Sequence, residues 1–218
     1  MIEKVFASVA SRYLSFVYRT SEIIIRGEGA QAVRAGHTSP DGAERFVIGF
    51  WHGESCACYP LLRDSGIYII TTLSGRGALV DALSRRFGYI PIRLPDESRG
   101  ENHIFKVRSA INGSNGGHLA MSLDGPTGPR HEPKKLVPVL AMASRRRIIT
   151  LSVRAKRKVN LRRWDKFMIP LPFNRLEFYF HEPLAVNRAG IDGVCADIAR
   201  KAADDWPARE PAAAEIVD

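Results

Sequence analysis

The chain has 218 residues, of which 45% are hydrophobic and 25% are charged, a composition that is ordinary for a globular protein. This length fits one domain with a buried core, and no apolar run is long enough to span a bilayer. The formal net charge of +9 favours an anionic partner, namely nucleic acid, an anionic membrane or a phosphorylated substrate, without choosing among the three.

The first segment, residues 3–19, predicts a helix with an apolar face. Its apolar positions are Val5, Phe6, Val9, Tyr13, Phe16 and Val17, with Lys4, Arg12 and Arg19 among the polar ones. Two interpretations stay open. The helix lies on anionic lipid as an interfacial element, or it packs on the core of its own domain.

Short apolar runs rich in Ile, Val, Phe and Tyr predict buried strands, and helical stretches lie between several of them. The strands are expected at residues 46–51, 68–72, 89–92, 119–123, 148–153 and 176–180, and the helices at residues 54–63, 77–87, 103–112, 137–143 and 192–206. This alternation indicates an α/β fold, a single domain with a mixed, mostly parallel sheet flanked by helices. We expect an amphipathic helix at residues 1–20, the α/β domain at 21–206 and a flexible tail at 207–218.

The strand at residues 46–51 leads into His52, Gly53 and Glu54. Functional sites of α/β folds lie at the carboxyl ends of strands, so His52 is a candidate general base. Gly53 permits a close approach, and Glu54 is positioned to orient His52. The alternative is a structural histidine, or zinc ligation with Cys56 and Cys58, although the paired ligands of zinc sites are missing.

The three cysteines do not form a disulfide framework, because their number is odd and Cys56 and Cys58 are separated by a single residue. We therefore expect a reducing compartment. No signal peptide is visible at the start of the sequence.

The strand at residues 119–123 is followed by a turn rich in glycine and proline. The turn contains Asp124, Gly125, Pro126, Gly128 and Arg130. Asp124 is expected to accept hydrogen bonds from turn amides, and the planar guanidinium of Arg130 suits a phosphate group. A second arginine-bearing loop, at residues 93–99, includes Arg93, Ser98 and Arg99 and favours anions in the same way, unless it is a solvated surface loop.

Residues 164–173 combine aromatic, apolar and proline residues in a stretch that fits no regular element. Trp164, Phe167, Met168 and Phe173 are candidates for one wall of an acyl-binding groove, and Asp165 is expected to anchor the loop through Arg162, Arg163 or turn amides. The alternative is a lid over the core that contacts no ligand.

Together these motifs resemble an uncharacterised bacterial branch of the lysophospholipid acyltransferase superfamily. Its members resemble this chain in Trp51-His52-Gly53, Ser98-Arg99-Gly100, residues 124–130 and residues 164–173, in that order. The similarity covers residues 45–185. It implies a glycerol-phosphate-acyltransferase-like fold and transfer of an acyl group from acyl-CoA or acyl carrier protein to a hydroxyl of a lysophospholipid or other lipid precursor.

The chain departs from the superfamily's H-x-x-x-x-D signature, because Ala57 stands five residues after His52. The carboxylate that assists His52 is therefore sought elsewhere, with Glu54 as first candidate and Asp124 as second. The resemblance implies His52 as general base without a covalent acyl-enzyme. It also implies that Arg93, Arg99 and Arg130 hold a phosphorylated lipid acceptor, with no metal or cofactor beyond the acyl donor as co-substrate.

We expect peripheral attachment to an anionic membrane at the cytoplasmic side of the inner membrane, and no nucleic-acid partner. The rival interpretation is a non-catalytic basic protein that binds anionic lipid or nucleic acid. The pI of about 9.8 supports it, but no zinc finger, recognition helix or aromatic RNA platform is present. A serine hydrolase is disfavoured because no Gly-x-Ser-x-Gly motif occurs.

Overall fold

The computed structural model describes residues 2–38, 44–95, 101–113, 117–186 and 190–203. Its helices are α1 (Ile2–Arg19), α2 (Glu28–Thr38), the 3₁₀ helix η1 (His52–Glu54), α3 (Ser55–Cys58), α4 (Gly75–Arg86), α5 (Glu101–Ile111), α6 (Leu136–Ala143) and α7 (Ile191–Ala203). Its strands are β1 (Glu22–Arg26), β2 (Phe46–Phe50), β3 (Tyr68–Thr72), β4 (Ile90–Leu94), β5 (Leu119–Ser122), β6 (Arg147–Ala155), β7 (Lys158–Asn160), β8 (Met168–Pro170) and β9 (Arg175–Phe180).

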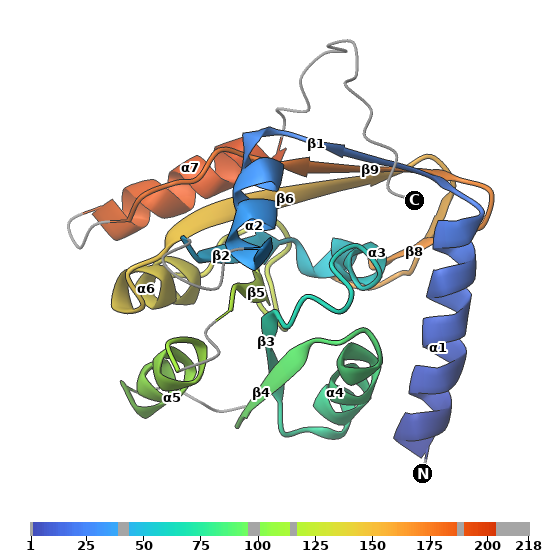
Figure 1. Cartoon of the computed structure of the whole chain (residues 1–218), viewed down its shortest axis with the longest axis horizontal. Coiled ribbons are helices and arrows are strands. Elements are labelled where there is room, and N and C mark those ends of the chain that lie inside the picture. Colours follow the sequence, from blue (N-terminus) through green and yellow to red (C-terminus); the bar gives the residue numbers. More distant parts are fainter. Residues whose placement is uncertain (1, 39–43, 96–100, 114–116, 187–189, 204–218) are drawn as a thin grey trace.

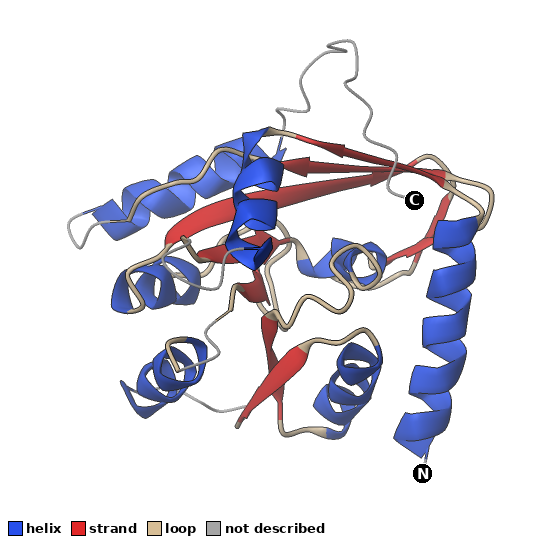
Figure 2. Cartoon of the chain, in the orientation of Figure 1, coloured by secondary structure: helices blue, strands red, loops and turns tan. Residues whose placement is uncertain are grey.

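Among the described residues, seven strands form one sheet in the order β1-β9-β6-β2-β5-β3-β4 (Figure 1). Every neighbouring pair is parallel except β6 and β9, which are antiparallel. A short hairpin of β7 and β8 lies beside the sheet, and the helices cover both of its faces (Figure 2). The expected mixed, mostly parallel α/β sheet flanked by helices is therefore confirmed.

The strands form because their side chains are buried on both faces, as is typical of parallel sheets. β2, with the sequence FVIGF, lies between β5 and β6, and four of its five residues are buried. Alternate residues face two separate clusters. One cluster packs against α1, α2, α3 and α4, and the other against α5, α6 and α7.

The sequence pattern missed several elements. β1 and α2 were not expected, nor was the β7–β8 hairpin. The helix expected at residues 54–63 is much shorter, because α3 ends at Cys58 and the chain continues in turns through Asp64. Pro60 contributes to this ending, since it has no amide hydrogen to donate to the preceding turn.

α1 packs on the core with one face, where Ala7, Leu14 and Val17 are buried. Two tyrosines fasten it: Tyr13 donates to the carbonyl of Pro170 at 2.8 Å, and Tyr18 donates to the carbonyl of Ala57 at 2.5 Å. The core-packing interpretation therefore holds for this face. No helix in the described part of the chain is both long enough and apolar enough to cross a membrane.

Candidate active site

The site begins where β2 and its parallel neighbour β5 end at the same edge of the sheet. β2 delivers the buried Trp51 and then His52, while β5 leads into the buried Asp124. The Asp124 carboxylate accepts a hydrogen bond from the backbone amide of His52 at 2.8 Å and another from the amide of His131 at 3.3 Å. Asp124 therefore fixes the backbone of both loops, and its contact with His52 is through the main chain.

The side chain of His52 is held by Asp165, which lies 113 residues further along the chain. The two are joined by a 2.8 Å contact between His52 Nδ1 and Asp165 Oδ2. Asp165 is buried, whereas the His52 side chain keeps 26% of its surface exposed. A carboxylate oxygen only accepts, so Nδ1 carries the hydrogen and Nε2 is left with a lone pair. The side chain that carries this lone pair is partly exposed.

Asp165 is itself fixed by two further contacts. Its Oδ1 accepts from the backbone amide of Phe167 at 3.2 Å, which closes a tight local turn. The guanidinium of Arg163 lies 3.5 Å from Oδ2. An arginine or turn amides were expected to anchor the loop of this aspartate, and both contacts are present. Its pairing with His52 was not foreseen, since no local spacing rule joins residues so far apart.

Glycines allow the three motifs to meet. A Cβ at Gly53 would lie 2.2 Å from the backbone oxygen of Asp165, so only glycine admits the aspartate loop beside His52. A Cβ at Gly128, whose φ is +71°, would lie 2.5 Å from the ring of Trp164. Gly53 therefore leaves room for the backbone of Asp165, and Gly128 leaves room for the ring of Trp164.

Aromatic rings surround the histidine. The ring centroid of Trp164 lies 5.4 Å from that of His52, and that of Phe167 lies 6.3 Å away. The ring of Trp51 lies against that of His131, with centroids 4.7 Å apart and the planes tilted by 30°. Trp164 and Phe167 thus lie beside the partly exposed His52, where a wall of the expected acyl groove would lie.

The other two residues proposed for that wall lie elsewhere. Met168 is buried in the core cluster with α1 and α3, with 4% of its surface exposed. Phe173 lies on the surface beside α1, and its ring centroid is 6.2 Å from that of Phe16. The segment therefore runs from His52, through the core, to the molecular surface.

Glu54, the first candidate for the carboxylate partner, points toward β6. Its Oε2 accepts from the backbone amide of Val153 at 3.1 Å. Burial raises the pKa of Glu54 to about 8, although the charges of Arg130 and Lys158 act in the opposite direction. The carboxyl is therefore mostly protonated at neutral pH, which is a poor state for stabilising an imidazolium.

The structure describes two of the arginines that were expected to hold a phosphate, Arg130 and Arg93. Arg130 is exposed, and its charge acts on both Glu54 and His131. Arg93 is held on β4, where its guanidinium donates twice to the carbonyl of Thr72 at 3.2 Å. Gly125 and Pro126 lie in the turn after Asp124. Ser98 and Arg99 lie outside the described residues.

The two cysteines near His52 are partly covered thiols. Burial raises the pKa of Cys56 to about 12 and raises that of Cys58 well above its ordinary value. Ala57, between them, is fully buried in the core, so a carboxylate at the signature position would point away from solvent. Within the described ranges, no group of three metal-ligating side chains comes together.

Comparison with known proteins gives few relatives in sequence. No protein-family model matches the chain. An uncharacterised protein of Rickettsia prowazekii, RP090, is 26% identical over 143 residues, which are 64% of this chain and 64% of that protein. The chain thus spans less than two thirds of the length of this relative.

Comparison of structures is more informative about the fold. The chain is similar to the crystal structure of the 1-acyl-sn-glycerophosphate (LPA) acyltransferase PlsC from Thermotoga maritima, with a TM-score of 0.53 over 95% of this chain and 81% of that one. The two sequences are 14% identical, so the likeness concerns the fold. The expected acyltransferase-like α/β fold is confirmed.

Proposed function

We propose that the chain transfers an acyl group from a thioester donor, acyl-CoA or acyl carrier protein, to a hydroxyl of a lysophospholipid or other lipid precursor. The observation that carries this proposal is the pair of His52 and the buried Asp165, joined at 2.8 Å in an acyltransferase-like fold. The pair would provide a general base whose tautomer is fixed by Asp165 and whose side chain is partly exposed.

In the proposed mechanism, Nε2 of His52 takes the proton of the acceptor hydroxyl while the hydroxyl oxygen attacks the carbonyl carbon of the thioester. Asp165 stabilises the imidazolium that forms. The carbon–sulfur bond then breaks, the new ester is released, and the imidazolium returns its proton to the departing thiolate. No protein nucleophile is needed, so no covalent acyl-enzyme forms. General base catalysis of this kind contributes roughly 100- to 10,000-fold.

The surroundings of His52 support roles for the other groups. Trp164 and Phe167 would contact the acyl chain next to the thioester. The phosphate of the acceptor would be held by Arg130, whose charge acts on Glu54. Arg93, Ser98 and Arg99 would contribute to the same phosphate site. Gly125, Pro126 and Gly128 would shape the turn beside the base. We expect the protein to work as a peripheral enzyme at the cytoplasmic face of the inner membrane.

The test is an acyl-transfer assay with His52→Gln. Candidate acceptors come from lipid analysis of a deletion strain, where an acyl-deficient lipid should accumulate. His52→Gln should fold like wild type and lose at least 100-fold in turnover. His103→Gln, on α5, is the matched control and should retain activity. Wild-type turnover of His52→Gln would refute the role of this base, and the non-catalytic binding protein would then be the better interpretation.

A further inference from the structure

The outer face of α1 carries an exposed apolar stripe opposite the face that packs on the core. Ile2, Val5, Val9 and Phe16 recur every three, four and seven residues and are 78%, 60%, 64% and 41% exposed. At 100° per residue they fall on one side of the helix, with Arg12 and Arg19 along the edge of the stripe. Contiguous exposed apolar surface of this kind marks an interaction site.

Phe173 extends this stripe beyond the end of the helix. Its side chain is 67% exposed, and its ring meets that of Phe16 edge to face. Its backbone has φ of +55°, a conformation that bulky residues rarely adopt. The conformation is held by the amide, which donates to Thr20 Oγ1 at 3.2 Å, and by Arg157, which donates to the Phe173 carbonyl at 3.4 Å. The loop therefore holds an aromatic ring outward.

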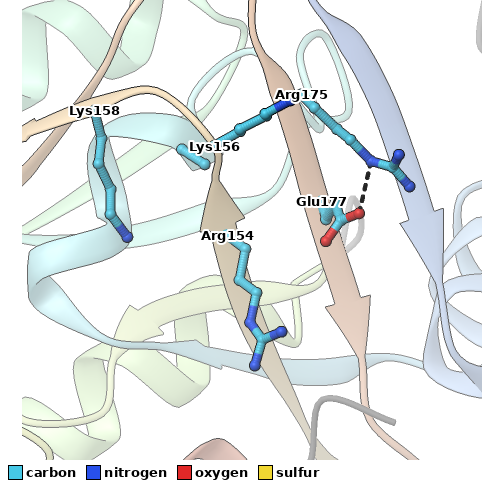
Figure 3. Close-up of a pocket in the computed structure, with 6 residues that line it drawn as sticks. Arg154, Lys156, Lys158, Arg175 and Glu177 are labelled. Carbon is cyan, nitrogen blue, oxygen red and sulfur yellow. Dashed lines mark hydrogen bonds and ion pairs between the residues drawn. The ribbon is translucent and has the colours of Figure 1, made fainter. Parts of the chain in front are cut away.

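A basic hollow lies next to the Phe173 loop. Its volume is about 350 Å³, and it is lined by Arg154, Ala155, Lys156, Lys158, Arg175 and Glu177 (Figure 3). Four of these six lining residues are cations, and the carboxylate among them, Glu177, pairs with Arg175 at 2.8 Å. This excess suits an anionic ligand such as a phosphate group.

The hollow and the aromatic ring are fixed relative to one another by Asn174, the buried residue between Phe173 and Arg175. Its side chain accepts from the backbone amide of Arg157 at 2.8 Å and donates to the carbonyl of Leu171 at 3.0 Å. Arg157 lies between Lys156 and Lys158, which line the hollow. One asparagine therefore ties the basic turn to the aromatic loop.

We propose that the α1 stripe, Phe173 and the basic hollow form a docking surface for a bilayer of anionic phospholipid, with Phe173 at the edge between α1 and the hollow, which opens on the opposite face of the sheet. Phe173 inserts among the acyl chains while the hollow holds the phosphate of one lipid headgroup. The combination of exposed apolar side chains with neighbouring cations favours lipid over nucleic acid, which offers phosphates but no hydrocarbon interior. The choice of a lipid partner rests on the proposed acyl transfer.

This surface also connects the membrane to the candidate active site. The segment of residues 164–173 begins at Trp164, beside His52, and ends at Phe173. Its middle, Met168, is buried in the core. A bilayer bound at Phe173 would therefore lie at one end of a ten-residue segment whose other end lies beside His52.

The test is vesicle co-sedimentation of the full chain with phosphatidylglycerol and with phosphatidylcholine vesicles. Phe173→Asn removes the ring and keeps a residue that tolerates positive φ, so the variant should fold. It should bind phosphatidylglycerol vesicles roughly tenfold more weakly. Phe105→Asn is the matched control, since Phe105 is 69% exposed on α5, on the other side of the molecule from α1 (Figure 1). It should bind like wild type.

The hollow is tested with Lys156→Ala/Lys158→Ala. Loss of two charges should weaken binding to phosphatidylglycerol roughly thirtyfold at low salt, with a smaller loss as salt is added. The matched control is Arg108→Ala/Arg200→Ala, which removes two charges from α5 and α7 and should have a much smaller effect.

If the test and control variants lost equal amounts of affinity for phosphatidylglycerol vesicles, with melting temperatures unchanged, the proposed docking surface would be wrong. Salt-dependent binding of DNA through Lys156 and Lys158 without any binding to vesicles would also overturn it. The assay needs no catalysis, so vesicle binding that depends on Phe173 in a protein without acyl transfer would separate failure of the proposed function from failure of this inference.

Discussion

Replacing Glu54 by Gln tests the electrostatics of the site without any substrate. Burial raises the pKa of Glu54 to about 8 from the ordinary value of 4.5. Between these two values the folded state keeps a proton that the unfolded state releases. Wild-type stability should therefore fall as pH rises through this window, by about 1.4 kcal/mol for each pH unit from this group alone.

The glutamine side chain of Glu54→Gln is neutral in both the folded and the unfolded state. The stability of this variant therefore does not fall with pH through this position. Its amide oxygen can still accept the hydrogen bond from Val153 N, which wild type makes at 3.1 Å. The two proteins should have similar stability at pH 4.5. At pH 7 Glu54→Gln should be the more stable by about 3 kcal/mol, which corresponds to roughly 6–12 °C in Tm for a chain of this size.

The measurement is urea unfolding of both proteins at several pH values between 4.5 and 8, because the difference between the two curves cancels every other titrating group. Glu44→Gln is an informative contrast. Its hydrogen bond with Arg147 lowers the pKa of Glu44, so wild type should gain from this pair above pH 4.5 and the variant should lose that gain. Parallel curves for wild type and Glu54→Gln would mean that Glu54 is ionised in the fold, and the reasoning that disfavours it as partner of His52 would fail.

Four further substitutions follow from the geometry of the site and of the core. Asp165→Asn leaves His52 without a carboxylate at 2.8 Å. It should lower the turnover of acyl transfer about 100- to 10,000-fold and shift the pH–rate profile, with KM nearly unchanged. An unchanged pH–rate profile would show that Asp165 does not act on His52. Gly53→Ala places a Cβ 2.2 Å from the Asp165 carbonyl oxygen, so both turnover and Tm should fall, and a fully active, equally stable variant would contradict this packing. Leu14→Ala should lower the free energy of unfolding in urea by about 2–5 kcal/mol, because Leu14 is 2% exposed. If a protein that lacks residues 1–19 melted at the same temperature as the full chain, α1 would add nothing to the stability of the core. Met168→Trp should overpack the core by about 1–3 kcal/mol and leave acyl-chain preference unchanged, whereas a shift toward shorter donors at constant Tm would return Met168 to the acyl groove.

Short-range patterns in the sequence were sufficient for much of the architecture. Each of the six expected strands corresponds to a strand of the sheet, because runs such as FVIGF at residues 46–50 are apolar on both faces and bounded by turns. The alternation with helices predicted parallel neighbours, and this placed His52 and Asp124 at the same edge. β1 was missed although Ile23, Ile24 and Ile25 form a short β-branched run, and its pairing with β9 joins Glu22 and Arg175, which are 153 residues apart.

Tertiary structure decided the roles of the carboxylates and of the aromatic segment. Sequence proximity favoured Glu54 as the neighbour of His52, but the 3₁₀ turn directs Glu54 to the amide of Val153. Asp165 reaches the imidazole only because Gly53 leaves room for its backbone. Likewise, Trp164 and Phe173 are nine residues apart in one motif, yet the first lies beside His52 and the second beside Phe16. The sequence by itself determined which segments are buried, since burial follows local hydrophobic periodicity. Which side chains meet was decided by the packing of distant segments against one another, which depends on the space between them and not on their spacing along the chain.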